Sequence, residues 1–382
     1  FGSSPAAGPA PSSDGSAGPM LLHDSGRALH REAPQLEAGS RRGRGMEDLR
    51  WSPQEVSEGT PSRRDGVSDQ AERAARFTAC QFARSMVKEL IGGGSRGDLD
   101  EASSRTQMLA CLLVQFFFMF RSLRQEDPNA VATAAAFLAC KVCDTPRRMR
   151  DILRSYGVLH TKAGGAELER EEQKSLCDKI VGVEFLLLRI IRFNFDMSLP
   201  LGEVDGLADR LLTALSRSTP FREWAAARGQ QPVAAAAELR PQVARVARNF
   251  LNDAFLGLGP LLFSPRTVAA GAVVFAARYT IRKMAMPMSE LCRLFGDHAA
   301  AEEVERASEE ILKVFKLSSA SAAAARAGAG AASGAGGAAA SPAAPGGRSA
   351  SSADAGGGGA AASPAAAAAR PAAGADSGGG GA

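Results

Sequence analysis

Few residues of this chain have the types and spacing that catalysis requires. Cys140 and Cys143 have the spacing of a metal-ligand pair, but no second cysteine pair or closely spaced histidines complete four ligands. His160 is a lone candidate, and the four histidines (His23, His30, His160, His298) form no recognisable dyad. The sequence contains no glycine-rich phosphate-binding motif. We therefore expect two half-buried helix thiols here, with no metal, no cofactor and no catalytic residue.

Composition favours a protein that acts by binding. The 382 residues suggest two or three domains, and the formal net charge is +4. The arginines are scattered, which allows acidic partners without arguing for nucleic acid. The six cysteines lie mostly inside apolar helical runs, so we expect a reducing compartment. No apolar run approaches the roughly 18 residues of a membrane span, so we expect no membrane contact.

The stretch from Asp127 to Pro146 predicts a buried central helix. Asp127 is a good N-cap, and Pro128 suits the first helical position, where an N–H group is not needed. The alanine-rich residues that follow are apolar nearly all round, which is typical of a helix enclosed by neighbours. We expect Pro146 to open the next helix, which is rich in arginine.

A second stretch, from Ser264 to Arg278, repeats this pattern without a gap. Val131 aligns with Val268 and Lys141 with Arg278, an offset of 137 residues (268 − 131). Each copy is followed by a short helix and then by a longer helix with an acidic and apolar run. Solenoid repeats have periods of about 20–50 residues, so this longer repeat indicates two similar helical domains.

These patterns predict an all-α fold of two tandem five-helix bundles with disordered tails. We expect a disordered arm over residues 1–45, a first bundle over 46–199, a second over 200–317, and an Ala/Gly/Ser-rich disordered tail over 318–382. The tails contain too few large apolar residues to offset the entropy of ordering. In the second bundle we expect an insertion over about 217–239 and a helix that begins at Pro241.

Several short motifs resemble the cyclin family. Residues 141–146 (KVCDTP) are similar to the Lys-x-Glu-Glu-x-Pro element of the first cyclin box, and residues 184–195 resemble the fifth helix of that box. Residues 60–66 (TPSRRDG) look like the opening motif of the transcriptional cyclins of types K, L and T. Residues 250–253 (FLND) look like the second-box signature of that branch. The resemblance covers about residues 49–317 and implies that both bundles are cyclin boxes.

The resemblance implies a non-catalytic subunit that binds and activates a cyclin-dependent kinase. In such complexes the cyclin holds a regulatory helix of the kinase inward, so that the kinase's own Lys–Glu pair positions the ATP phosphates. By position, Lys141 and Glu184 match the family's charged pair, which hydrogen-bonds the kinase backbone. An ordinary exposed ion pair, worth about 0–1 kcal/mol, is the alternative interpretation. The other kinase-binding residues that the resemblance implies are Val142, Asp144, Leu188, Phe193 and Phe195.

The sequence departs from the cyclin pattern at two places that concern the implied kinase-binding residues. Cys143 replaces the first acid of the usual acidic pair, which leaves Asp144 alone. Gln115 and Phe116 stand where the family often has His-Arg. Residues 73–82 contain no counterpart of the docking patch of cell-cycle cyclins, so we do not expect substrates to dock by that route.

We therefore expect a nuclear protein that forms a heterodimer with a cyclin-dependent kinase. It would act in RNA polymerase II transcription or pre-mRNA processing, without contacting nucleic acid directly. The alternative is a general transcription factor similar to TFIIB, which uses the same double-box fold to bind DNA. Such proteins usually have an N-terminal zinc ribbon, and this sequence contains none. A helical scaffold without either partner is a third interpretation.

Overall fold

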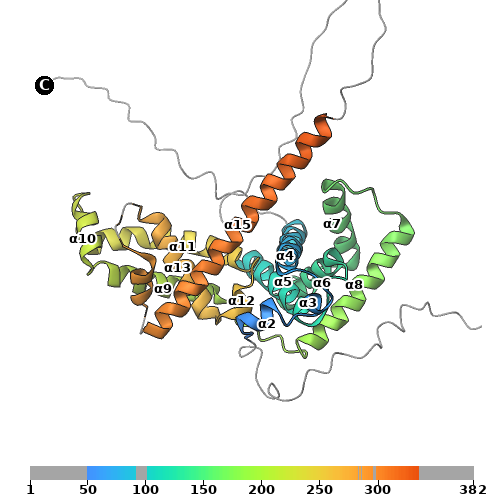
Figure 1. Ribbon diagram of the computed structural model, residues 1–382, viewed down its shortest axis with the longest axis horizontal. Coiled ribbons are helices and arrows are strands. Elements are labelled where there is room, and N and C mark those ends of the chain that lie inside the picture. Colours follow the sequence, from blue (N-terminus) through green and yellow to red (C-terminus); the bar gives the residue numbers. More distant parts are fainter. Residues whose placement is uncertain (1–49, 92–100, 283, 285, 296–297, 335–382) are drawn as a thin grey trace, which may run out of the picture. The chain divides into compact units, whose positions relative to one another are not determined.

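The computed structural model describes residues 50–91, 101–282, 284, 286–295 and 298–334 (Figure 1). Every regular element among these residues is a helix, which confirms the all-α prediction. None of the helices in these ranges is long and apolar enough to cross a membrane. The disordered arm predicted for residues 1–45 and the part of the predicted tail from 335 onward lie outside the described residues.

The first bundle has five long helices, and two short ones precede them. The short helices are α2 (Pro53–Ser57) and α3 (Pro61–Arg64). The long helices are α4 (Asp69–Ile91), α5 (Glu101–Phe120), α6 (Pro128–Val142), α7 (Met149–Lys162) and α8 (Arg170–Ile190). Helix α6 packs against α4, α5 and α8, so it is the central helix of the bundle.

Local sequence explains why α6 begins and ends where it does. The Asp127 side chain accepts a hydrogen bond from the Asn129 amide at 3.0 Å, and Pro128 occupies the first turn. All residues from 130 to 140 are buried. After the helix, Asp144 has a left-handed φ of 54°, and the Thr145 amide donates to the Cys140 carbonyl at 2.9 Å. This is the hydrogen bond of a Schellman ending, and the prediction of a buried central helix is confirmed.

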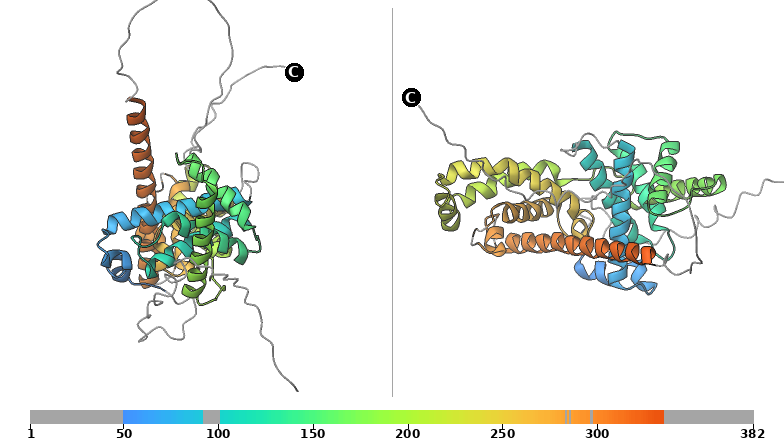
Figure 2. Two further views of the ribbon diagram at one scale, coloured as in Figure 1. Left: turned by 90° about the vertical axis from the view of Figure 1, so that its right-hand side faces the viewer. Right: turned by 90° about the horizontal axis from the view of Figure 1, so that it is seen from above.

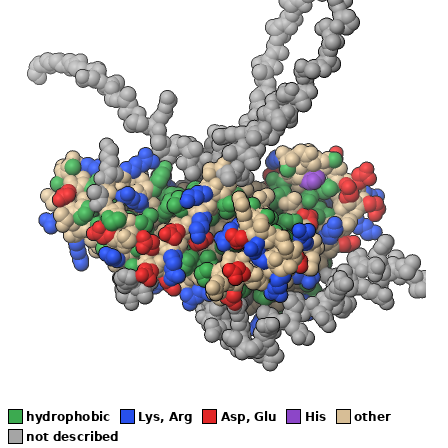
Figure 3. Space-filling view, in the orientation of Figure 1, with side chains coloured by type: hydrophobic (Ala, Val, Ile, Leu, Met, Phe, Trp, Pro, Cys, Tyr) green, Lys and Arg blue, Asp and Glu red, His purple; other side chains and the backbone are tan. Residues whose placement is uncertain are grey.

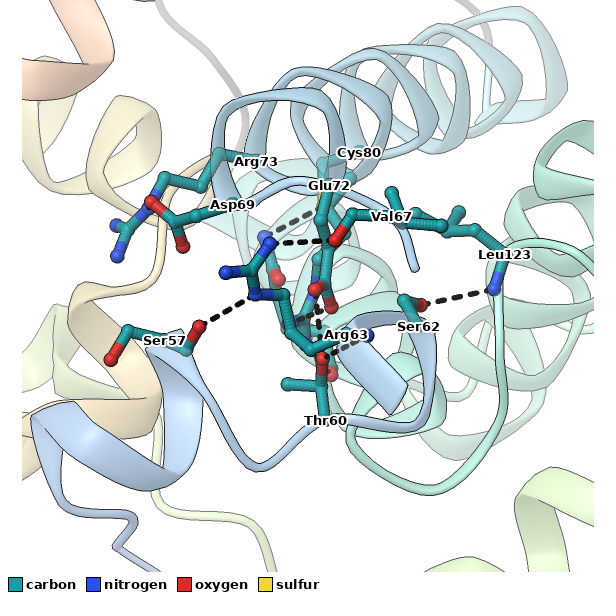
Figure 4. Close-up of polar contacts among 12 residues, drawn as sticks. Ser57, Thr60, Ser62, Arg63, Val67, Asp69, Glu72, Arg73, Cys80 and Leu123 are labelled. Atoms are coloured by element: carbon teal, nitrogen blue, oxygen red, sulfur yellow. Dashed lines mark hydrogen bonds and ion pairs between the residues drawn. The ribbon is translucent and has the colours of Figure 1, made fainter. Parts of the chain in front are cut away.

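A buried polar network ties the start of the first bundle together. The Thr60 hydroxyl caps α3 and donates to Glu72 Oε2 at 2.7 Å (Figure 4). Glu72 Oε1 accepts from Arg76 Nη1 at 3.3 Å, and Arg76 Nη2 donates to the Gln115 carbonyl at 2.6 Å. The network therefore joins α3, α4 and α5, and it gives the first residue of the TPSRRDG motif a structural role.

Other residues of that motif fix the turn between α3 and α4. The Ser62 hydroxyl accepts from the Leu123 amide at 3.1 Å, and Arg63 Nη1 donates to the Val67 carbonyl at 2.6 Å (Figure 4). Gly66 has a φ of 80°, a conformation that side-chain-bearing residues rarely adopt. The motif thus positions the short helices against the first bundle.

The second bundle repeats the arrangement around α13. Its elements are the 3₁₀ helix η2 (Pro200–Glu203), α9 (Val204–Leu215), α10 (Thr219–Ala226), α11 (Pro232–Ala254), α12 (Gly259–Leu262), α13 (Pro265–Thr280), α14 (Met288–Arg293) and α15 (His298–Gly334). Helix α13 packs against α9, α11 and α14. In Figure 2 the blue to green helices form the first bundle, and the yellow to orange helices form the second.

Two predicted helix starts were wrong. Helix α7 begins at Met149 rather than Pro146, because Arg147 Nε donates to the Leu90 carbonyl at 2.9 Å and holds the preceding segment against the end of α4. Helix α11 begins at Pro232 and continues through Pro241. The alanines before Pro241 favour helix and several are buried, which outweighs the cost of about 3 kcal/mol for an interior proline.

The last helix also differs from the prediction. We expected α15 to end at Leu317 and residues 318–382 to be disordered, but the helix continues to Gly334. Residues 318–334 are mostly alanine, the residue with the highest helix propensity. The structure places the chain up to Ala327 in one compact unit that holds both bundles. The domain boundaries at 46 and 200 therefore stay a prediction.

Direct contacts join the two bundles. Arg84 Nη1 lies 2.9 Å from Asp253 Oδ1, and the Trp51 amide donates to the Leu261 carbonyl at 3.0 Å. The Gln115 side chain donates from Nε2 to the Leu256 carbonyl at 3.2 Å. Gln115, one of the departures from the family pattern, therefore hydrogen-bonds the second bundle.

Candidate functional site

Lys141 and Glu184 form an ion pair between α6 and α8. The Lys141 Nζ atom lies 2.6 Å from Glu184 Oε1. It also lies 3.9 Å from the centre of the Phe137 ring, one turn earlier on α6. The lysine side chain is 42% exposed and the glutamate side chain only 11%, so a mostly buried carboxylate and an aromatic ring hold an accessible ammonium. The structure therefore brings together two side chains that lie 43 residues apart in the sequence.

The ion pair has hydrogen-bonding capacity beyond its own contact. An ammonium carries three donors, and the contact with Glu184 uses one of them. A carboxylate offers about four lone-pair positions. The pair can therefore bind carbonyl and amide groups of an approaching backbone. Because α6 and α8 pack against each other, the Lys141 ammonium and the Glu184 carboxylate are held in a fixed arrangement.

Exposed apolar side chains lie on α8, the helix that carries Glu184, and on the residues that follow it. Val181 is 50% exposed, Phe185 53%, Phe193 55% and Phe195 46%. These are four of the seven large hydrophobic side chains that are exposed in the described part of the chain. Val181, Phe185 and Leu188 are spaced by four and three residues, so they share one face of α8. We call Val181, Phe185, Phe193 and Phe195 the apolar stripe.

Val181 and Phe185 were not among the predicted site residues. The other side of α8 is buried through Leu176, Ile180, Val183 and Leu187. Residues 180–191 contain more apolar side chains than one buried face of a helix needs. The surplus of apolar residues in this segment is the sequence signal for a second apolar surface. The signal does not indicate which of the side chains are exposed.

The remaining predicted residues occupy the ends of the same two helices. Val142 and Leu188 are half-buried and pack against the hydrophobic core. Asp144 is exposed and lies two residues after the end of α6. Phe193 and Phe195 follow α8 and belong to the apolar stripe.

Unusual backbone conformations also gather here. Among the described residues, the non-glycine residues with positive φ are Asp144 (54°), Arg192 (55°) and Phe193 (56°). Aspartate tolerates this region, but for arginine and phenylalanine it costs roughly 1–2 kcal/mol each. The Phe193 amide donates to the Leu188 carbonyl at 2.9 Å and ends α8. Such strain concentrates at functional sites, and here it accompanies the exposed ring of Phe193.

The cysteine pair near the site does not resemble a metal centre. Cys143 is half-buried, as predicted, whereas Cys140 is fully buried. Burial raises the pKa of both thiols above the ordinary value, so the thiol form is favoured over the thiolate that metals bind. In the described ranges, no group of three or more His, Cys, Asp or Glu side chains could hold a metal ion.

Charged side chains are dispersed on the face seen in Figure 3. Lysine and arginine are interspersed with aspartate and glutamate there, and they form no continuous basic block. Two arginines of α11 pair with acids of α9, Arg240 with Asp209 and Arg248 with Asp205. These ion pairs reduce the positive potential that α11 offers to an anionic partner.

Comparisons with known proteins identify similar chains. No protein-family model matches. The chain is 31% identical over 231 residues to Cyclin-T1-1 of Oryza sativa subsp. japonica, which covers 59% of this chain and 44% of that protein. It is 27% identical over 249 residues to Cyclin-T1-2 of Arabidopsis thaliana, covering 64% and 46%. A chain in a crystal structure of the yeast RNA Pol II CTD kinase CTDK-1 complex gives a TM-score of 0.47 at 14% identity, covering 70% and 74%.

The matches span less than half the length of these two plant proteins. They confirm the resemblance to transcriptional cyclins.

Proposed function

On the premise that this chain is a relative of the T-type transcriptional cyclins, we propose that it binds and activates a cyclin-dependent protein kinase. The chain would act as a regulatory subunit in a heterodimer and would leave the phosphoryl transfer to its partner. The observation that carries the proposal is the Lys141–Glu184 pair together with the apolar stripe, which lies on and after the helix that carries Glu184.

The geometry suits an approaching helix and loop. A helix of the partner would lay its apolar face against the stripe, as amphipathic helices do in hydrophobic grooves. Burying the exposed half of a phenylalanine contributes about 1 kcal/mol. Lys141 and Glu184 would hydrogen-bond backbone groups of the partner and so fix its orientation. A helix held in this way is what the kinase needs to keep its own Lys–Glu pair assembled.

The dispersed surface charge supports a protein partner over DNA. We propose that the complex acts in the nucleus, in RNA polymerase II transcription or pre-mRNA processing. The similarity to T-type cyclins supports transcription.

Reconstitution with purified proteins tests this function. The full chain is co-expressed with a panel of cyclin-dependent kinases, and co-purification and phosphorylation of a peptide substrate are measured. Lys141→Ala and Glu184→Ala should each lower kinase activity at least tenfold, since each leaves a charge without its partner. Arg278→Ala, at the aligned position of the second bundle, is the matched control and should retain activity.

Two results would reject the proposal. One is that no kinase of the panel co-purifies with the wild-type chain. The other is duplex DNA binding that weakens steeply with salt and does not depend on Lys141, which would favour the DNA-binding alternative.

A further inference from the structure

A cavity lies where the two bundles meet, on elements other than α6 and α8. It has a volume of about 360 Å³, which is within the range of ligand-binding pockets. Helices α4 and α5 line one side, the turn after α11 lines another, and α15 closes the third. We call it the seam cavity.

The walls of the seam cavity are apolar. Leu256 and Leu258 contribute from the turn after α11, and Val314 and Leu317 contribute from α15. Leu317 is only half-buried, so the cavity opens toward solvent at this side chain. Walls of this kind suit one or two large aliphatic or aromatic side chains.

Basic side chains outnumber acidic ones in the lining of the seam cavity. It contains Arg73, Arg76, Lys313 and Lys316 against a single acid, Glu310. Arg73, Arg76 and Lys313 each have one carboxylate partner on their own helix. Lys316 is exposed and has no ion-pair partner among the residues that the structure describes. A ligand with acidic groups beside its apolar side chain therefore fits this opening.

The floor has unused hydrogen-bonding capacity. Arg76 Nε and Gln115 Oε1 are buried and have no hydrogen-bond partner in the described structure. Arg76 is 1% exposed and Gln115 also 1%, and both line the cavity. Leaving such atoms unpaired costs about 1–3 kcal/mol each. One is a donor and the other an acceptor, which is the combination that complements a peptide group.

From the apolar walls, the basic opening and the polar floor, we propose that the seam cavity binds a linear peptide segment of a partner protein. The segment carries a large apolar side chain flanked by acidic residues. The apolar side chain enters between Leu256 and Leu317, and the acidic residues face Lys313 and Lys316. This site shares no lining residue with the Lys141–Glu184 pair, so variants of the cavity leave the proposed kinase-binding residues unchanged.

A peptide selection on the intact chain tests the proposal. A random dodecapeptide phage library is selected against the full-length protein, and enriched peptides are synthesised with a fluorescent label for anisotropy titrations. We expect enriched sequences with net negative charge and at least one large apolar residue. Their affinity should fall as salt is raised, because exposed charges are screened.

Three variants locate the binding site. Lys313→Glu combined with Lys316→Glu should weaken binding at least tenfold, because the favourable charges become repulsive. Leu317→Asp, which changes an apolar wall, should weaken binding comparably. Arg306→Glu reverses an exposed charge on the same helix outside the cavity and is the matched control.

The outcomes are decisive in both directions. Acidic, apolar peptides that lose affinity in both cavity variants and keep it in Arg306→Glu support the proposal, provided that thermal unfolding shows each variant folded. Enriched peptides that are neutral or basic overturn it. Equal binding to the wild type and the cavity variants, or no enrichment, also overturns it. Kinase co-purification by the same variants separates a failure here from a failure of the proposed function.

Discussion

The central helices α6 and α13 have the same sequence pattern, yet the basic residues in their last turns make different contacts. In the first bundle Lys141 bridges from α6 to Glu184 of α8 and remains accessible. In the second bundle the aligned Arg278 donates from Nη1 to the carbonyl of Met284, six residues later, at 2.9 Å. The acid of the following run, Glu310, pairs with Lys313 on its own helix at 2.5 Å. At these two positions the second bundle thus uses its charged groups for internal contacts.

The two bundles also differ in how many large hydrophobic side chains they expose on corresponding helices. Helix α8 and the residues after it expose Val181, Phe185, Phe193 and Phe195, whereas α15 exposes one large hydrophobic side chain in its described part, Leu312. The shared pattern therefore specifies the packing of both bundles, and only the first bundle combines accessible charge with an apolar stripe. This contrast supports the proposal that the kinase binds at the first bundle, and each prediction below would break or sharpen it.

Charge reversal should have the largest effect. Lys141→Glu places a second carboxylate beside the mostly buried Glu184, and we expect kinase affinity to fall at least a hundredfold, measured by titration calorimetry. The corresponding Arg278→Glu should change affinity less than threefold. The double variant Lys141→Glu with Glu184→Lys restores an ion pair and should recover thermal stability but not binding. Equal losses for Lys141→Glu and Arg278→Glu would remove the distinction between the bundles.

Glycine substitutions in the two bundles should change the free energy of unfolding in opposite directions. A Cβ atom at Gly271 of α13 would lie 3.1 Å from the Ser308 amide nitrogen of α15, so Gly271→Val should lower the free energy of unfolding by about 1–3 kcal/mol. Gly157 of α7 has open space around that position. Gly157→Ala should instead raise stability by about 0.5–1 kcal/mol. Urea denaturation measures both, and a neutral Gly271→Val would contradict the close packing of α13 and α15.

Removing one ring of the apolar stripe should weaken binding without unfolding the chain. Phe185 is 53% exposed, so Phe185→Ala should leave the melting temperature nearly unchanged and reduce kinase affinity about tenfold. Leu312→Ala is the matched control on α15. Loss of affinity in the control alone would move the binding surface to the second bundle.

The smallest effect concerns thiol reactivity. Burial raises the pKa of Cys143 above the ordinary value of 9.0, so the reactive thiolate forms only at high pH. Its alkylation rate in the free chain should therefore keep rising beyond pH 9. Kinase binding should slow alkylation of Cys143, two residues from Lys141, severalfold and leave Cys292 of the second bundle unchanged. Mass spectrometry of alkylated peptides gives both rates, and equal protection of the two thiols would argue against binding at the first bundle.

The parts of the fold that sequence predicted are those with local signals. The cap and proline at Asp127 and Pro128 and their repeat at Ser264 and Pro265 are short-range features, and the helices begin where they indicate. Helix α11 passes through Pro241 because the packing of the preceding alanines outweighs the cost of a proline inside a helix. A prediction from local sequence counts the cost of the proline but does not include the packing.

The candidate site was predictable in part. Lys141 and Glu184 were paired only through resemblance to a known family, because no local pattern links residues on separate helices. Val181 and Phe185 were missed because the apolar run of α8 has two apolar sides, and only the packed structure shows which side chains are exposed. The left-handed backbone at Phe193 has no sequence signature, since phenylalanine is an unfavourable residue for it.

Site-specific photo-crosslinking tests most directly which bundle the kinase contacts. A benzophenone amino acid replaces Phe185 in one sample and Leu312 in another, and each chain is irradiated in complex with the kinase that co-purifies with it. We predict a crosslinked heterodimer from position 185 and none from position 312. A crosslink from 312 with none from 185 would contradict the assignment of partner binding to the first bundle.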